Sequence, residues 1–151
     1  MESMSWEQKW MRLCIEKAQL FSKCAKRQYA ALIVDRYNRL IGSGYNGAPS
    51  GYPHCTQGAC PRYLNNTPSG SPYTDCIANH AEVNAISYTE YTLRREGTLY
   101  VNGPPCFECA KTISNSGLKR VCYLPDDSYL NWDKAKFMME YVGIELTAVE
   151  L

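Results

Sequence analysis

Long apolar runs, an export signal and a surplus of charge are all missing from this sequence. No stretch of about 18 apolar residues occurs, so we expect no membrane-spanning helix. The first ten residues, MESMSWEQKW, lack the basic and then apolar regions of a signal peptide, so we expect a soluble cytoplasmic protein, in the host cytoplasm if a virus encodes it. Sixteen basic and fifteen acidic residues give a net charge of +1, which attracts a phosphate polymer only weakly and favours a small-molecule partner.

Histidine is scarce, with two residues, whereas cysteine is abundant, with eight. A chain of 151 residues is long enough to bury a core of its own, and we expect a single domain over residues 1–151. Such a chain does not need a disulfide framework, and cysteines in a reducing compartment more often hold metal or carry out chemistry. The cysteines are therefore the first residues to examine for a function.

Helical and strand patterns alternate along most of the chain. Ser5 and Gln8 form the pattern of a capping box at the start of a helix. The apolar residues expected on one face of that helix are Trp6, Trp10, Leu13 and Cys14. Further helices are expected at about 80–91, from Pro105 to Gly117 and at 130–142, and strands at 29–34, 40–45, 98–101, 120–124 and 144–149.

The order of these elements predicts the fold class. The first two strands, joined by a turn at 35–39, are expected to form a hairpin. Strands alternating with helices predict an α/β fold with three α/β/α layers, in which helices flank a mixed sheet of about five strands. The segment from about 46 to 78 interrupts the alternation and is rich in glycine, proline and cysteine. A loop of that length is usually functional or held in place by something.

Two cysteines lie close together in the segment GPPCFECAK, residues 103–111. The spacing of Cys106 and Cys109 serves a redox dithiol, half of a structural zinc site or half of a catalytic one. A thioredoxin-like dithiol normally follows the first strand of a βαβ unit, whereas this pair lies late in the chain. Both cysteines lie near the start of a predicted helix, where the positive end of the helix dipole favours a thiolate.

The segment NHAEVNAI, residues 79–86, contains one of the two histidines, followed two positions later by a glutamate. A hydrolytic zinc site needs three protein ligands and one position left for water, and His80 with Cys106 and Cys109 supplies three. Glu82 is placed to reach a water on that metal, for which a structural zinc site has no use. His-x-Glu followed by Pro-Cys-x-x-Cys is the signature of zinc nucleobase deaminases.

Three segments together, HAEVNAI, PPCFECAK and GYNGAPSG (44–51), resemble the deoxycytidylate deaminases, a branch of the zinc-dependent cytidine deaminase group. The resemblance covers roughly residues 22–149. It implies the cytidine deaminase-like fold, a catalytic zinc, hydrolysis of dCMP to dUMP and ammonia, and a homohexamer. It also implies a role in supplying dUMP for the synthesis of dTMP.

The chemistry of such a site predicts a role for each group. Zinc lowers the pKa of its water to about 7, so that hydroxide is available at neutral pH. Glu82 is expected to take the proton of the water and pass it to N3 of cytosine, which makes C4 electrophilic. Attack at C4 and a second proton transfer then release the amino group as ammonia. General acid–base help of this kind contributes about 10²–10⁴-fold in rate.

The resemblance also suggests residues that bind nucleotides. It implies that Asn46 hydrogen-bonds the sugar of the substrate and that Ala81 contacts the substrate. It further implies that a regulatory triphosphate, dCTP as activator or dTTP as inhibitor, binds at Gly44, Tyr45, Asn46 and Gly47. The alternative is that the glycines and Asn46 only form a turn, since both residue types favour turns.

A second metal site and the phosphate site are less well defined by the sequence. Some relatives carry a structural zinc in the region of the long loop, for which the expected ligands are Cys24, Cys55, Cys60 and Cys76, with His54 as a substitute. The alternative is that these cysteines are simply buried. The candidate cations for a substrate phosphate are Lys26, Arg27, Arg36 and Arg62. Asn102 and Pro104 depart from the threonine and serine that are commoner in relatives, so base or sugar selectivity could differ.

Other functions share parts of this pattern. A deaminase of nucleic-acid bases has the same three ligands but needs a basic, aromatic-lined groove. A protein that binds zinc only for structure needs no Glu82. Deaminases of dCTP, cytidine, guanine and pterin or riboflavin precursors share the zinc motifs, and GYNG with the cysteine-rich loop is the reason to prefer dCMP.

Overall fold

The computed structural model describes residues 3–24, 27–59, 61–65, 76–129 and 131–151. Its centre is a five-stranded mixed sheet in the order β2-β1-β3-β4-β5. The strands are β1 (Ala30–Val34), β2 (Leu40–Tyr45), β3 (Thr98–Val101), β4 (Arg120–Tyr123) and β5 (Glu145–Ala148). β1 pairs antiparallel with both β2 and β3, which confirms the hairpin, and β3, β4 and β5 run parallel.

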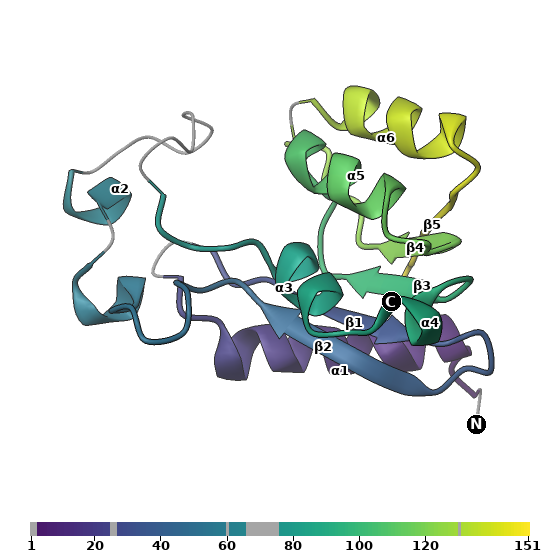
Figure 1. Ribbon diagram of the computed structural model, residues 1–151, viewed down its shortest axis with the longest axis horizontal. Helices are drawn as coiled ribbons and strands as arrows, with labels where there is room; N and C mark the ends of the chain where they lie inside the picture. Colours follow the sequence, from purple (N-terminus) through teal and green to yellow (C-terminus); the bar gives the residue numbers. More distant parts are fainter. Residues whose placement is uncertain (1–2, 25–26, 60, 66–75, 130) are drawn as a thin grey trace.

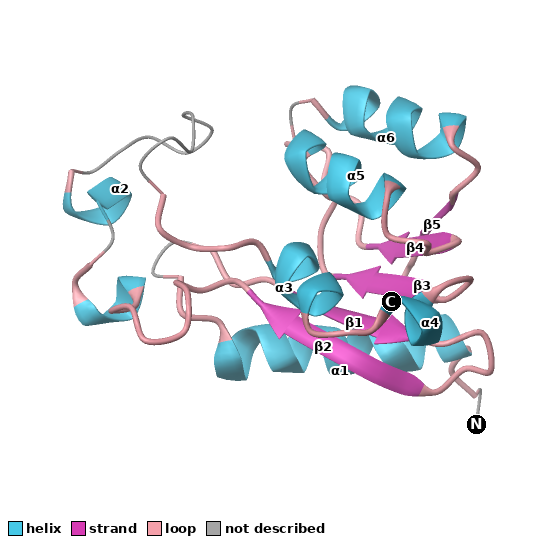
Figure 2. Cartoon of the chain, in the orientation of Figure 1, coloured by secondary structure: helices cyan, strands magenta, loops and turns pink. Residues whose placement is uncertain are grey.

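Helices cover both faces of the sheet, as the alternation of elements predicted (Figures 1 and 2). Helix α1 (Trp6–Phe21) packs on one face. Helices α3 (Ala81–Ser87), α5 (Phe107–Ser114) and α6 (Trp132–Tyr141) pack on the other. The short elements are η1 (Cys55–Gln57), α2 (Pro61–Leu64) and α4 (Tyr91–Arg94). No helix among the described residues is both long and apolar enough to cross a membrane.

The capping box at the start of α1 is confirmed, but the predicted buried face of this helix is partly wrong. The Ser5 hydroxyl accepts a hydrogen bond from the Gln8 amide at 3.1 Å, and the Gln8 side chain accepts one from the Ser5 amide at 3.0 Å. The buried residues are Met11, Cys14 and Ala18, a stripe with the helical period. The other apolar side chains of the prediction, except the partly buried Trp10, are exposed: Trp6 (56%) and Leu13 (43%).

Two predicted helix boundaries also need correction. The helix expected over 80–91 divides, because α3 ends at Ser87 and the Thr89 hydroxyl closes it by donating to the Ala85 carbonyl at 2.7 Å. The helix expected from Pro105 begins at Phe107 instead. Its N-cap is Cys106, whose sulfur accepts the Cys109 amide, so the proline lies before the cap rather than in the first turn.

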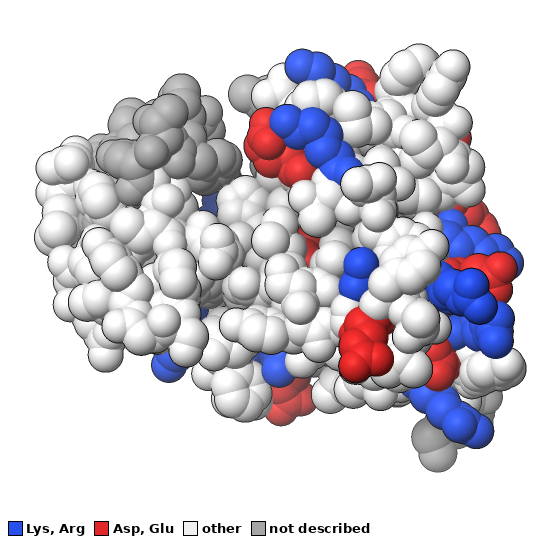
Figure 3. Space-filling view, in the orientation of Figure 1, with Lys and Arg blue, Asp and Glu red and all other residues white. Residues whose placement is uncertain are grey.

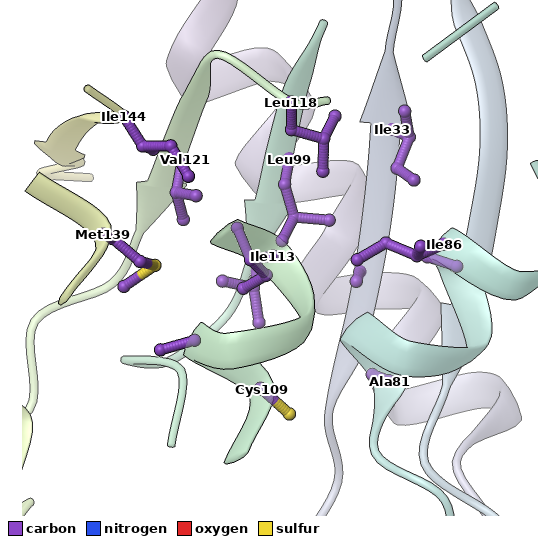
Figure 4. Packing of buried hydrophobic residues seen from close by; sticks show 14 of the residues in the cluster. Ile33, Ala81, Ile86, Leu99, Cys109, Ile113, Leu118, Val121, Met139 and Ile144 are labelled. Carbon is purple, nitrogen blue, oxygen red and sulfur yellow. The ribbon is translucent and has the colours of Figure 1, made fainter. Parts of the chain in front are cut away.

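The larger of the two cores lies between the sheet and the helices α3, α5 and α6. Ile33, Leu99 and Val121 from three adjacent strands meet Ile113 and Met139 from α5 and α6, and all five side chains are fully buried. Figure 4 shows these side chains spread across the sheet, with Ile33 facing Ile86 of α3, Leu99 facing Ile113 of α5 and Val121 facing Met139 of α6, while Cys109 and Ala81 lie at the ends of α5 and α3. The core therefore fixes α3 and α5 side by side.

Candidate active site and metal centre

The candidate site lies at one edge of the sheet, where the carboxyl ends of β2 and β3 meet the start of β1. Because α3 leads back along the sheet into β3 and α5 follows β3, both helices begin at this edge. His80 is the N-cap of α3 and Cys106 is the N-cap of α5. Open α/β sheets commonly bind ligands outside the carboxyl ends of their strands.

The two helix starts bring three metal-ligating side chains together. His80 Nδ1 lies 3.2 Å from Cys109 Sγ and 3.4 Å from Cys106 Sγ. The ligand atoms of all three residues lie within 4.8 Å of one another. Tetrahedral zinc with its usual bond lengths separates a nitrogen and a sulfur ligand by about 3.5 Å. The donor set and its spacing therefore fit a zinc ion with one position left for a further ligand.

The electrostatics of the two cysteines favour a thiolate. Hydrogen bonds from the Cys109 thiol, from His80 and from the Cys109 amide lower the pKa of Cys106 to about 4, against the opposing effect of its burial. The pKa of Cys109 is raised, mainly because its thiol donates a hydrogen bond to Cys106 and because it is buried. The pKa of His80 is raised mainly by its hydrogen bond to Cys106. A divalent cation is the natural charge to stabilise two neighbouring thiolates.

Glu82 lies in the first turn of α3, where it interacts with all three ligands. Its side chain is buried, with 6% of its surface exposed. Burial raises the pKa of the Glu82 carboxyl, while the charge of His80 opposes that rise. A carboxyl with a raised pKa can hold a proton and release it, which is what a general acid–base requires.

The GYNG segment at the end of β2 packs directly against α3. A Cβ atom at Gly44 would lie 2.6 Å from the Ala81 carbonyl oxygen and 2.5 Å from the Ala85 amide nitrogen, both backbone atoms of the helix. The Tyr45 carbonyl accepts a hydrogen bond from the Asn84 side chain at 2.8 Å. Only glycine allows this close approach, so the packing of α3 is itself a reason for glycine at position 44.

The same segment also fixes the chain next to a metal ligand. Gly47 and Asn79 form an isolated antiparallel bridge, with backbone hydrogen bonds of 2.8 and 3.2 Å, immediately before His80. Ala81, the predicted substrate contact, is fully buried at the start of α3. These contacts give the segment 44–47 a structural role, and its binding of a regulatory nucleotide stays a prediction.

Asn46 is buried, and its side chain binds the protein itself. Its carboxamide oxygen accepts hydrogen bonds from the Tyr29 amide at 2.9 Å and from the Ser22 hydroxyl. Its carboxamide nitrogen donates to the Arg27 carbonyl at 2.8 Å. One N–H of the carboxamide remains beyond these bonds, so the predicted contact with a substrate sugar would have to use that hydrogen.

A pocket of about 440 Å³ opens beside the three metal ligands. Apart from the three ligands, its lining residues are Cys76, Ala78, Asn79, Val83, Phe107, Glu108, Thr112, Tyr129 and Asn131. Sequence reasoning did not single out Tyr129 and Asn131. Both belong to the connection between β4 and α6, and its position after a parallel strand next to β3 was a signal that could have identified them.

The expected second zinc site is not assembled among the described residues. In that part of the chain, the three ligands described above form the only group of three metal-ligating side chains within 4.8 Å. Cys24 and Cys76 are partly exposed and Cys55 is buried, whereas Cys60 lies outside the described residues. The predicted substitute, His54, has a buried Nδ1 atom without a hydrogen-bond partner among the residues that the structure describes.

The candidate cations for the substrate phosphate lie in different parts of the molecule. Arg36 lies in the turn after β1, at the opposite edge of the sheet, and pairs with Glu96 at 3.2 Å, so its assignment is wrong. Arg27 lies at the same edge as the metal ligands, just before β1. Arg62 belongs to α2, and Lys26 lies outside the described residues.

Charge on the face shown in Figure 3 is mixed rather than of one sign. Basic and acidic side chains alternate over α5 and α6 in that view. The ion pairs within these two helices include Lys111–Glu108 at 2.8 Å in α5 and Lys136–Glu140 at 4.0 Å in α6. This face therefore lacks the continuous basic surface on which a polynucleotide binds.

Comparison with known proteins identifies the family to which this site belongs. Residues 4–125 match the family model of the cytidine and deoxycytidylate deaminase zinc-binding region. The chain is 37% identical over 128 residues to the deoxycytidylate deaminase of Mycobacterium phage D29, which covers 82% of this chain and 97% of that protein. It is 33% identical over 145 residues to the deoxycytidylate deaminase of Schizosaccharomyces pombe, covering 94% of this chain and 43% of that longer protein.

A solved structure shows the same fold. The dCMP deaminase of cyanophage S-TIM5, in complex with dCMP and dUMP, aligns with a TM-score of 0.75 at 20% identity, over 99% of this chain and all of that one. This likeness confirms the three-layer α/β architecture with its mixed sheet. Together with the matched zinc-binding region, which spans most of the sequence, it leads to one assignment. The chain belongs to the cytidine and deoxycytidylate deaminase family.

Proposed function

We propose that this protein hydrolyses dCMP to dUMP and ammonia. The observation that carries the proposal is the group of His80, Cys106 and Cys109 with the buried Glu82 behind it. The substrate is supported by the names of relatives that are 33% and 37% identical and by the dCMP and dUMP bound to the S-TIM5 enzyme. The mixed charge of the face shown in Figure 3 and the net charge of +1 support a nucleotide rather than a polynucleotide.

The residues divide the chemistry among them. His80, Cys106 and Cys109 would hold the metal, and zinc bound there would supply a Lewis acid that lowers the pKa of a water molecule to about 7. Glu82, with its raised pKa, accepts the proton of the attacking water and delivers it to N3 of the cytosine ring. The protonated ring accepts the oxygen at C4, and Glu82 then transfers the proton of the new C4 hydroxyl to the amino group, so that the C4–N bond breaks and ammonia leaves.

The surroundings of Glu82 suit a proton carrier. The carboxyl is almost completely buried, so bulk water does not compete for its proton. Cys106 and Cys109, as two thiolates, would offset the charge of a divalent cation. Glu82 is then the remaining acid–base group beside the metal ligands. The pocket of about 440 Å³ beside the ligands has the size of a small-molecule site.

Regulation and assembly extend the same proposal. The GYNG segment resembles the regulatory segment of deoxycytidylate deaminases, which supports activation by dCTP and inhibition by dTTP in a homohexamer that supplies dUMP for dTMP synthesis. Asn46 contacts the sugar and Ala81 lies against the substrate in this proposal. A second, structural zinc with Cys24, Cys55, Cys60 and Cys76 as its ligands is part of the same proposal, and His54, whose Nδ1 atom has no hydrogen-bond partner among the described residues, is the alternative ligand.

The first experiment is to follow dUMP formation from dCMP by chromatography, with purified zinc-loaded protein, alone and with added dCTP or dTTP. We expect turnover that rises with dCTP and falls with dTTP. Turnover that is indifferent to both triphosphates retains the enzyme and removes the regulation. If zinc-loaded protein forms no dUMP but deaminates dCTP, cytidine, guanine or single-stranded DNA, the substrate assignment is wrong. Metal analysis on the same sample tests the second zinc, since one zinc per chain at full activity excludes it.

A further inference from the structure

One arginine contacts the C-terminal ends of both helices that begin at the metal centre. Arg94 is the last residue of α4 and is partly buried. Its Nε atom donates a hydrogen bond at 2.8 Å to the carbonyl of Ser116, two residues after α5. Its Nη1 atom donates to the Ile86 carbonyl in the last turn of α3 at 3.3 Å, and to the Thr89 carbonyl just after that helix. The guanidinium thus joins the two helices at the ends opposite to those that carry the metal ligands.

The contacts of Arg94 match the charge of these helix ends. The C-terminal end of a helix carries a partial negative charge and several carbonyls without a partner inside the helix. Thr89 satisfies one of these carbonyls in α3, since its hydroxyl donates to the Ala85 carbonyl at 2.7 Å. A guanidinium holds its donors in a fixed planar fork, so Arg94 can bind carbonyls from two helices at once. The cation therefore lies where one positive charge stabilises both helices.

Close packing holds α4 against the chain that leaves α5. Gly117 has a φ of +86°, and a Cβ atom there would lie 2.6 Å from the Tyr91 ring. The Glu96 amide donates a hydrogen bond to the Gly117 carbonyl at 2.8 Å. The guanidinium of Arg94 lies 5.6 Å from the centre of the Tyr91 ring, and α4 lies just beyond the last turn of α3 in Figure 1. Arg94 is thus fixed between the two helices by the packing of its own helix as well as by its hydrogen bonds.

The opposite ends of the same helices carry the groups of the metal centre. His80 and Glu82 lie at the start of α3, and Cys106 and Cys109 lie at the start of α5. The helices contain seven and eight residues, so each is about 10–12 Å long. A tilt of about 5° at one end of such a helix moves the other end by about 1 Å. Since metal–ligand distances tolerate deviations of only about 0.2 Å, the separation of the C-terminal ends affects how well the ligands meet.

We infer that Arg94 is a positioning residue for the metal centre, which sets the separation and tilt of α3 and α5 through the carbonyls at their C-terminal ends. The inference rests on the proposed function, because it concerns the same metal centre. The core that contains Ile86 and Ile113 also holds these helices together. The contribution of Arg94 therefore has to be separated from general stability, by measuring ligand geometry beside folding.

The test compares two partly buried arginines that join different elements. Arg94→Gln removes the connection between α3 and α5. Arg120→Gln is the matched control, since Arg120 joins α1 to the sheet by contacting Glu7 at 3.0 Å and Thr147 at 3.3 Å, away from the metal ligands. Four properties of each variant are measured: urea unfolding without metal, zinc affinity by competition with a chelator, the visible spectrum after zinc is replaced by cobalt(II), and kcat and KM for dCMP.

We expect both variants to unfold at a lower urea concentration than the wild-type protein, because each loses buried hydrogen bonds. Arg94→Gln alone should bind zinc about 10-fold more weakly, since the metal then has to bring the two helix starts together. Its cobalt(II) spectrum should also change, because the spectrum depends on ligand geometry. The kcat for dCMP should fall about 3- to 30-fold with KM within about twofold, because Glu82 shifts relative to the metal ligands. Arg120→Gln should match the wild type in zinc affinity, spectrum and kcat.

Arg94→Lys keeps the charge and tests the planar contact. An ammonium should stabilise the helix ends without spanning both, so zinc affinity and kcat should lie between those of the wild type and Arg94→Gln. A folded Arg94→Gln protein with wild-type zinc affinity and cobalt(II) spectrum would overturn the inference. If Arg94→Gln does not fold, wild-type values in Arg94→Lys would overturn it. Changes of equal size in Arg120→Gln would also overturn it, because they would follow from lost stability alone.

Failure of the proposed function gives a different result. Zinc affinity and the cobalt(II) spectrum need no substrate, so they test the role of Arg94 even if the wild-type protein does not convert dCMP. Conversely, dUMP formation by the wild-type protein, with no selective effect of Arg94→Gln on zinc or on the spectrum, would retain the reaction and remove the positioning role.

Discussion

Two pairs of cysteines in this molecule have the same thiol side chains but lie in opposite environments. Cys14 and Cys122 lie in the core under α1, where burial raises their pKa values to about 12 and about 11. Cys106 and Cys109 lie at the start of α5 beside His80, and the pKa of Cys106 is lowered to about 4. The position of a cysteine relative to a helix start and a histidine thus decides whether it ligates metal or fills a core.

The core pair also shows how a thiol is kept inert. Cys14 Sγ donates to the Ala30 carbonyl at 3.2 Å and lies 3.7 Å from the Tyr100 carbonyl oxygen, so its proton is held by the backbone of two strands. Cys122 is fully buried on β4. Both residues lie in the core on the α1 side of the sheet, whereas the metal ligands lie on the side of α3 and α5, and we expect neither to ligate zinc.

The same substitution in each pair gives the largest contrast. Cys109→Ser should reduce zinc affinity by about 100-fold or more and abolish deamination, because a thiolate ligand is lost. Cys122→Ser should keep one catalytic zinc and its activity while lowering the free energy of unfolding by about 1–3 kcal/mol, because a hydroxyl replaces a thiol in the core. Zinc per chain by atomic absorption and the unfolding midpoint check both. Loss of zinc from the Cys122→Ser variant would contradict the claim that only the cysteines at the start of α5 bind the metal.

Glu82→Gln tests whether the group behind the ligands has a role apart from binding metal. We expect full zinc content and a kcat lower by about 10²–10⁴-fold, because glutamine keeps the shape of the side chain but cannot transfer a proton. The readouts are zinc content and dUMP formation on one preparation. An active, zinc-loaded Glu82→Gln protein would rule out the acid–base role.

Much of this site follows from the sequence, and the limits have physical causes. His80, Cys106 and Cys109 could be grouped because their spacings and the helix starts after them are local patterns. The bonds of Asn102 to residues 28 and 30 were not predictable, because side-chain bonds that span more than 70 positions leave no local signal. The buried face of α1 was misjudged because Trp6 stacks on Trp10 outside the core, whereas Met11 and Cys14 enter it.

Gly44→Ala tests whether the GYNG segment positions the catalytic helix. The added methyl group would overlap backbone atoms of α3, so we expect a loss of about 1–3 kcal/mol in the free energy of unfolding and a fall in kcat without any added nucleotide. Gly47→Ala is the matched control, because its Cβ atom would meet only the Lys23 side chain at 3.3 Å and the Tyr45 ring at 3.6 Å. Equal stability of the two variants would contradict the packing role of Gly44.

The smallest expected effect belongs to the face of the sheet that carries no ligands. The pKa of Glu7 is lowered by a hydrogen bond from its own backbone amide at the start of α1 and by Arg120, whose guanidinium lies 3.0 Å from the carboxylate. A lowered pKa in the folded state means that the ionised form stabilises folding above the unfolded pKa of about 4.3, and that this stability is lost as pH falls through the folded value. Because the pair is partly exposed, Glu7→Gln should lower the free energy of unfolding by less than about 1 kcal/mol at pH 7, and the difference should shrink below pH 4. Urea unfolding at both pH values measures this, and the kcat for dCMP should be the same in both proteins, since α1 and the metal ligands lie on opposite faces of the sheet.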